Sequence, residues 1–135
     1  MPKALIYTAG MLSKGNSEVA KYISDKGKTD IFNLKDLMRL NLDAYDTVIF
    51  GTGNNGGNPD RLVMEFMHNN MDALINKKKY LYVVVSKDDE KTGEQVQKIG
   101  KDLGVPDVVS FNKRSEDMNN FGMPSSVDDF ISGLE

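Results

Sequence analysis

The chain contains no cysteine and no tryptophan, and it has only one histidine among its 135 residues. Without cysteine, disulfides, thiolate nucleophiles, iron–sulfur clusters and most structural zinc sites are excluded. The histidine, His68, lies among polar residues of a predicted helix, where a surface role is far more common than catalysis. No pattern of metal ligands is present, so any redox chemistry has to come from a cofactor.

Long apolar runs and clusters of positive charge are also absent. No apolar stretch approaches the ~20 residues of a membrane span, and the run after Lys3 is too short for a secretion signal. Seventeen Lys and Arg against 20 Asp and Glu give a net charge of -3, which argues against a nucleic-acid partner. We expect a cytoplasmic protein without a membrane span, folded as a single domain over residues 1–135.

Short apolar runs alternate with helical patterns along the chain. Strands are predicted over residues 4–7, 30–34, 47–50, 80–85 and 108–111. Helices are predicted from an N-cap at Ser17 to Gly27, from Pro59 to about Ile75 with Lys77, Lys78 and Lys79 at its end, around 96–103, and over 127–134. This alternation predicts an α/β fold, with a parallel sheet covered on both faces by helices.

Three loops rich in Gly, Ser, Thr, Asn and charge follow the first, third and fourth predicted strands: residues 8–17, 51–58 and 86–92. In an open parallel sheet, ligands bind outside the carboxyl ends of the strands, where these loops meet. The first loop has the composition of an anion nest before a helix, although an ordinary turn with a capping serine has the same composition. A nucleotide P-loop is not expected, because Asn16 stands where that motif requires lysine after Gly15.

The residues Leu5-Ile6-Tyr7-Thr8 followed by Gly15-Asn16-Ser17 resemble the first strand and phosphate loop of flavodoxins, which usually end in Gly-Asn-Thr. The segment from Leu42 to Gly51, the residues Val63-Met64-Glu65-Phe66 and the strand from Tyr80 resemble one branch of that family, which includes menaquinone-dependent protoporphyrinogen dehydrogenase. The resemblance covers residues 3 to about 112. It implies a flavodoxin-like three-layer sandwich with a five-stranded parallel sheet in the order 2-1-3-4-5.

The resemblance also implies that FMN binds noncovalently across the three loops. Its phosphate would contact Thr8, Ser13, Lys14, Gly15, Asn16 and Ser17, with backbone groups of Ala9 and Gly10. Its ring would lie between Thr52, Gly53, Asn54, Asn55, Gly56 and Gly57 on one side and Ser86, Lys87, Asp88 and Asp89 on the other. Two features depart from the family: the first loop is longer than usual, and neither ring-contacting loop contains an aromatic residue.

Two of these segments could also influence the flavin in flavodoxin fashion. A peptide in the stretch 55–57 could rotate on reduction, since glycine permits it, although a glycine-rich loop can also be merely flexible. The acids Asp88, Asp89 and Glu90 would disfavour an anionic reduced flavin. The alternative is that they form an ordinary solvent-exposed polar loop. The segment 119–122 could bring an aromatic side chain, Phe121, to the ring from elsewhere in the chain.

We therefore expect an FMN-binding carrier that shuttles electrons between redox protein partners, without catalytic residues of its own. Three alternatives remain. One is a protoporphyrinogen oxidase-like oxidoreductase, although the long insertion of that family is missing after the fourth strand. The second is a flavodoxin-like activator of manganese ribonucleotide reductase. The third is a binding module that kept the fold and lost FMN, which the missing aromatic residues favour.

Overall fold

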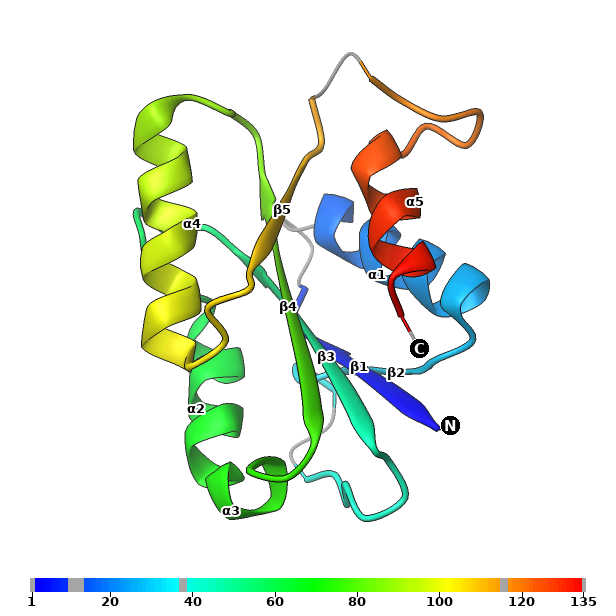
Figure 1. The fold of residues 1–135 in the computed structure, drawn as a ribbon, viewed down its shortest axis with the longest axis vertical. Coiled ribbons are helices and arrows are strands. Elements are labelled where there is room, and N and C mark those ends of the chain that lie inside the picture. Colours follow the sequence, from blue (N-terminus) through cyan, green and yellow to red (C-terminus); the bar gives the residue numbers. More distant parts are fainter. Residues whose placement is uncertain (1, 10–13, 37–38, 115–116, 135) are drawn as a thin grey trace.

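The computed structural model describes residues 2–9, 14–36, 39–114 and 117–134. Its centre is one parallel sheet of five strands in the order β2-β1-β3-β4-β5, which confirms the predicted fold class and strand order (Figure 1). The strands are β1 (Lys3–Tyr7), β2 (Asp30–Asn33), β3 (Thr47–Gly53), β4 (Lys78–Val85) and β5 (Val109–Asn112). Within the described residues, no helix is long and apolar enough to cross a bilayer.

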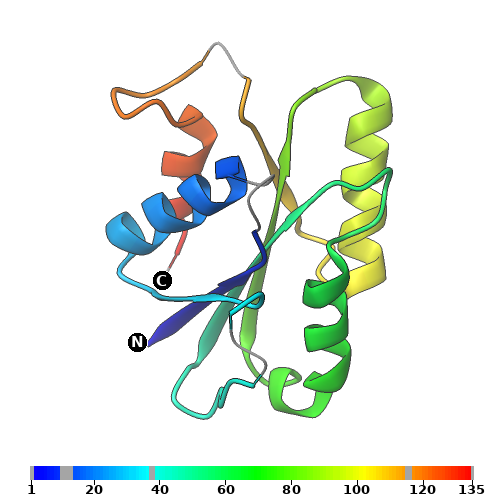
Figure 2. The same cartoon turned by 180° about the vertical axis from the view of Figure 1, so that it is seen from behind.

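Helices cover both faces of the sheet. On one face lie α1 (Lys14–Gly27) and α5 (Ser125–Ser132), and on the other lie α2 (Arg61–Asn69), α3 (Met71–Leu74) and α4 (Glu90–Leu103) (Figures 1 and 2). The central strands are buried on both sides, as their continuous apolar sequences require. Ile6 and Phe50 pack toward α2 and α4, whereas Leu5 and Ile49 pack toward α1 and α5.

Two predicted helix features are wrong in detail. Helix α1 begins at Lys14, so Ser17 lies in its first turn and does not cap it. The single helix predicted from Pro59 to Ile75 is interrupted at Asn70, whose backbone leaves the helical conformation at φ -116° and ψ 23°. Its side-chain amide and its backbone N–H both donate to the Phe66 carbonyl, at 2.8 and 3.0 Å. Asn side chains readily hydrogen-bond nearby backbone groups and so favour helix ends, a tendency that the apolar periodicity does not reveal.

The lysines placed at the end of that helix belong in part to the sheet. Lys78 and Lys79 begin β4, because the sheet extends to pair them with Thr47 and Val48 of β3. The Lys79 ammonium still donates to the Leu74 carbonyl at 2.9 Å, so it satisfies one of the last helical carbonyls of α3 from within the strand. The predicted role of a lysine at the end of this helix is therefore met across the helix–strand boundary.

The α1/α5 face of the sheet contains a buried aromatic cluster centred on Tyr82 of β4. The Tyr82 ring is 1% exposed and lies 5.2 Å from the Phe111 ring and 6.0 Å from the Phe130 ring, between centroids. Its hydroxyl has no hydrogen-bond partner among the described residues, and burial raises the pKa of Tyr82. A buried hydroxyl without a partner destabilises the fold, because folding removes its water.

Tyr82→Phe is therefore expected to raise the free energy of unfolding by about 1 kcal/mol, since it removes the buried hydroxyl and keeps the ring. Urea unfolding followed by circular dichroism measures the change. Tyr22→Phe is the matched control, because the Tyr22 hydroxyl donates to Asp128 at 2.6 Å and accepts from Asn119 at 3.0 Å. It should lower stability, and a loss of stability in Tyr82→Phe as well would show that the Tyr82 hydroxyl is satisfied in solution.

Candidate functional site

An open cleft of about 380 Å³ lies at the carboxyl ends of the strands, within the usual range for small-molecule sites. The loops after β3 and β4 form its walls, the first turns of α1 and α4 close its ends, and Val84 and Val85 of β4 also line it. Its other lining residues are Asn16, Gly53, Asn54, Asn55, Gly56, Asp60, Ser86, Lys87, Asp89, Lys91, Thr92, Gln95 and Lys113. The cleft is therefore mainly polar and occupies the position that a parallel sheet offers to ligands.

The loop after β3, which we call the glycine loop (residues 53–58), is anchored by hydrogen bonds to Asp60. The Asp60 carboxylate accepts from the Gly53 amide at 3.1 Å and from the Asn55 side chain at 2.9 Å. The Asp60 amide in turn donates to the Thr52 hydroxyl at 2.7 Å. The loop is thus fixed by its own hydrogen bonds, which a merely flexible glycine-rich segment would lack.

Two glycines at the tip of this loop have left-handed backbones that strongly favour glycine. Gly56 has a φ of 67°, and no heavy atom lies within 4 Å of the position where a Cβ would stand. Gly57 has a φ of 95° and packs against the side chains of Gln95 and Lys98 on α4. Gly56 therefore presents bare backbone to the cleft, whereas Gly57 packs the loop against α4.

In the acidic run after β4, Asp89 forms a helix cap and Asp88 is exposed to solvent. Asp89 caps α4 by accepting a 2.8 Å hydrogen bond from the Thr92 amide, and it lines the cleft. Hydrogen bonds from Thr92, together with the charges of Lys87 and Lys91, hold the pKa of Asp89 below its usual value. Asp88 is exposed and does not line the cleft. Of the acidic run, only Asp89 therefore faces the cleft, where Asp60 is the other lining carboxylate, and the charge of Asp89 is countered locally.

The first predicted loop is described only at its two ends. Gly10, Ser13 and the side chain of Lys14 lie outside the described residues. Thr8 is buried and directly follows β1, and its hydroxyl has no partner among the described residues. The backbone N–H and C=O of Ala9 both bond the Asn33 side chain, at 3.3 and 3.1 Å. Thr8 thus offers a hydroxyl that no described residue engages, while the Ala9 backbone is bonded to Asn33.

The structure gathers about half of the predicted site residues around the cleft: Asn16, Gly53, Asn54, Asn55, Gly56, Ser86, Lys87 and Asp89. Others surround it without lining it: Thr8, Ala9, Gly15, Ser17, Thr52, Gly57 and Asp88. Phe121, proposed as an aromatic from elsewhere, packs on Tyr22 at 5.9 Å, under the Lys26 ammonium, and is not among the lining residues.

Lys113 was not predicted, yet it reaches the cleft from the end of β5. Its Cδ and Nζ lie 3.2 and 3.7 Å from the position that a Cβ on Gly15 would occupy, so its side chain covers the first turn of α1. The described residues provide no hydrogen-bond or ion-pair partner for its ammonium. Its position could have been inferred, because β5 is the neighbour of β4 and its carboxyl end must reach the same edge of the sheet.

These features fit a flavin nucleotide. Thr8 contributes a buried hydroxyl to which no described residue is bonded, and Gly56 leaves open space where backbone can approach a flat ring. Lys113 offers a cation beside the α1 N-terminus. The described lining residues include no aromatic side chain, as expected from the two loops. The ring would therefore be held by backbone and polar groups together with Val84 and Val85.

The topology and the position of the cleft define a flavodoxin-like α/β protein. The flavodoxin domain matches residues 13–115, and the chain belongs to this family, whose members are flavin proteins. No curated protein matches the sequence.

Solved structures share the fold at low sequence identity. A flavodoxin, WrbA-like protein from Agrobacterium tumefaciens is 12% identical with a TM-score of 0.64, covering 99% of each chain. Flavodoxin 1 from Bacillus cereus is 16% identical with a TM-score of 0.62, covering 98% of this chain and 93% of its own. Rubredoxin oxygen:oxidoreductase from Desulfovibrio gigas is 9% identical with a TM-score of 0.66, covering 98% of this chain but only 35% of its own.

Proposed function

We propose that the chain is a single flavodoxin-like domain that binds FMN in this cleft and transfers electrons between redox protein partners. The observation that carries the proposal is the bare backbone at Gly56, facing an open polar cleft at the carboxyl ends of the strands in a chain of the flavodoxin family. The bound flavin would supply the redox chemistry, while the protein supplies position and electrostatics.

Each wall of the cleft has a distinct task under this proposal. The glycine loop and the Ser86–Asp89 segment would flank the ring, with backbone approaching it at Gly56. Asn16 and the first turn of α1 would face the phosphate, together with Lys113. An electron carrier needs no acid, base or nucleophile, so the mainly polar lining that the described residues form is sufficient for the function.

The proposal is tested by titrating the flavin-free protein with FMN and following the quenching of flavin fluorescence. Saturation at one FMN per chain is expected, and the reduced complex should pass electrons singly to a small protein acceptor such as a cytochrome. A protein that leaves FMN fluorescence unchanged would contradict the proposal and favour the binding module without flavin. Turnover of a porphyrinogen would instead favour the oxidoreductase.

Lys113→Gln is expected to weaken FMN binding about three- to tenfold, the range for a partly exposed charge on a phosphate. The affinity for riboflavin, which has no phosphate, should not change, and the FMN effect should shrink at high salt. Lys101→Gln on α4 removes the same charge from an exposed lysine that does not line the cleft, and it should alter neither affinity. Equal losses for FMN and riboflavin in Lys113→Gln would show that Lys113 does not face the phosphate.

A further inference from the structure

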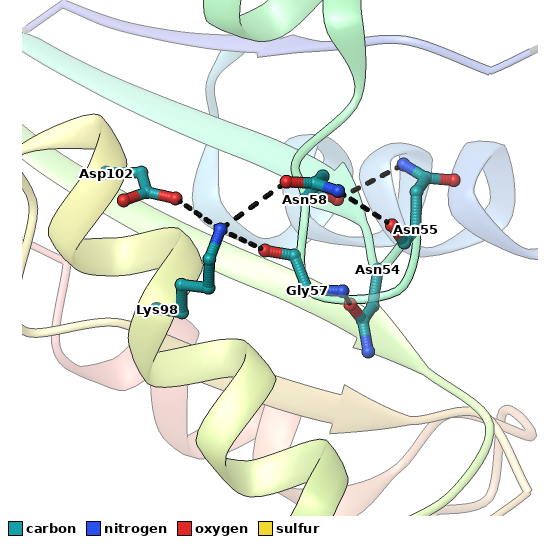
Figure 3. A network of polar contacts seen from close by, with 6 residues as sticks. All are labelled: Asn54, Asn55, Gly57, Asn58, Lys98 and Asp102. Atoms are coloured by element: carbon teal, nitrogen blue, oxygen red, sulfur yellow. Dashed lines mark hydrogen bonds and ion pairs between the residues drawn. The ribbon is translucent and has the colours of Figure 1, made fainter.

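The glycine loop is bound on its outer side, away from the cleft, by a lysine of α4. The Lys98 ammonium donates to the Gly57 carbonyl at 3.2 Å, to the Asn58 side-chain oxygen at 3.4 Å and to the Asp102 carboxylate at 2.8 Å (Figure 3). An ammonium has three donors, and these three acceptors engage all of them. Lys98 itself is absent from the lining of the cleft, so it would act on a ligand only through the loop.

The Lys98–Asp102 ion pair is a weak explanation for this arrangement. Both side chains are about half exposed, at 54% and 42%, and a pair four residues apart on a helix surface adds little stability. The order of the charges, cation before anion, is also the less favourable one for a helix dipole. Asp102 takes one ammonium donor, and the other two are directed at the glycine loop. These two bonds tie the loop to α4 on the side away from the cleft.

The hydrogen bonds of the loop show which peptide this contact restrains. The peptide between Gly57 and Asn58 is held at both ends, because its carbonyl accepts from Lys98 and its N–H donates to the Asn55 carbonyl at 3.3 Å. Among the residues that the structure describes, the preceding peptide, between Gly56 and Gly57, is held only by its N–H, which donates to the Asn54 side chain at 2.8 Å. Lys98 thus restrains the Gly57–Asn58 peptide, whereas the neighbouring Gly56–Gly57 peptide is joined to the described residues by a single bond.

A second contact from α4 supports the same part of the loop. The Asn54 side chain that receives the Gly57 N–H also donates to the Gln95 side chain at 2.8 Å. Gln95 and Lys98 are three residues apart and therefore neighbours on one face of α4. Gly57 lies against both, with their side-chain carbons 3.4 and 3.7 Å from the position of its missing Cβ.

We propose that Lys98 is a positioning residue for the flavin ring: by anchoring Gly57 and Asn58 to α4, it holds the glycine loop in the shape that receives the ring. This inference rests on the proposed function. It assigns Lys98 to the ring side of the site, in contrast to Lys113 on the phosphate side. The two lysines should therefore differ in their effects on riboflavin and FMN.

The first test needs no flavin. NMR water-exchange measurements on the flavin-free protein should show exchange of the Gly57 and Asn58 amides about three- to tenfold faster in Lys98→Gln, as expected for loss of one partly exposed charge-assisted hydrogen bond. The conservative Lys98→Arg variant should restore slow exchange. Lys101→Gln, with the same charge change on the same helix, should leave these amides unchanged.

The second test compares flavins. Lys98→Gln should weaken FMN and riboflavin by the same factor, about three- to tenfold, because the ring is common to both. The thermal unfolding midpoint should stay near that of Lys101→Gln, which excludes a general loss of stability. A merely structural lysine would move the unfolding midpoint and leave the relative affinities of Lys98→Gln and Lys101→Gln equal.

The outcomes separate this inference from the proposed function. If the wild-type chain binds FMN but Lys98→Gln matches Lys101→Gln in amide exchange and in both affinities, Lys98 is not a positioning residue and the electron carrier still stands. If Lys98→Gln weakens FMN but not riboflavin, the assignment to the ring side is overturned. If the wild-type chain binds no flavin, both proposals fail, and the exchange data then report only the order of the loop.

Discussion

Gly51→Ala is expected to lower the free energy of unfolding by about 3 kcal/mol or more, the upper range for overfilling a tight core. Gly51 pairs in the sheet with Tyr7 of β1 and Tyr82 of β4. A Cβ at Gly51 would overlap the hydroxyl end of the Tyr82 ring and would lie 2.8 Å from its Cε1. The ring cannot withdraw, because Phe111 and Phe130 pack against it within the buried face.

Gly93→Ala is the matched control for this substitution. Gly93 lies exposed inside α4, with no heavy atom within 4 Å of the position of a Cβ and no left-handed backbone. The same added methyl group should there raise stability by about 0.5 to 1 kcal/mol, because alanine favours helix. Urea unfolding measures both variants. A loss below 1 kcal/mol in Gly51→Ala would show that the Tyr82 ring can move aside at little cost.

The strands of the sheet could be predicted because the pattern that forms each of them lies within a few consecutive residues. Each central strand reads as a short run of apolar residues, and residues such as Val48 and Val83 are fully buried as that pattern requires. The order of the strands came from the flavodoxin resemblance, and the sheet agrees with it. The break at Asn70 could not be predicted, since it is a change of backbone conformation at a single residue and leaves the apolar periodicity unchanged.

The site was predicted less completely because its members come from distant parts of the chain. The glycine loop could be predicted as part of the site from its composition, and Gly56 and Asn55 do line the cleft. Lys113 and Gln95 carry no local signal, and they reach the cleft only because β5 and α4 pack beside β4. The acidic run could be recognised from its composition, but the composition did not show whether its acids face a ligand or solvent. In the structure Asp89 caps α4 by accepting from the Thr92 amide.

The glycine loop provides the second large effect. Gly56→Ala is expected to weaken FMN and riboflavin at least about tenfold, corresponding to the ~1.4 kcal/mol that a new methyl group in a tight contact readily removes. The methyl group would enter the open space at Gly56, where the proposed ring approaches the backbone. It would also restrict rotation of the Gly56–Gly57 peptide, whose freedom depends on two adjacent glycines with φ of 67° and 95°.

Gly56→Ala adds both backbone strain at a left-handed residue and a methyl group in the space proposed for the ring. Gly104→Ala is the control that adds only the strain. Gly104 caps α4 with a φ of 75°, again with no heavy atom within 4 Å of the position of a Cβ, and it is not among the residues lining the cleft. Both variants should therefore lose about 1 kcal/mol of folding stability to left-handed strain. Only Gly56→Ala should lose flavin affinity, as measured by fluorescence titration. Equal affinities in the two variants would mean that the flavin does not approach the glycine loop at Gly56.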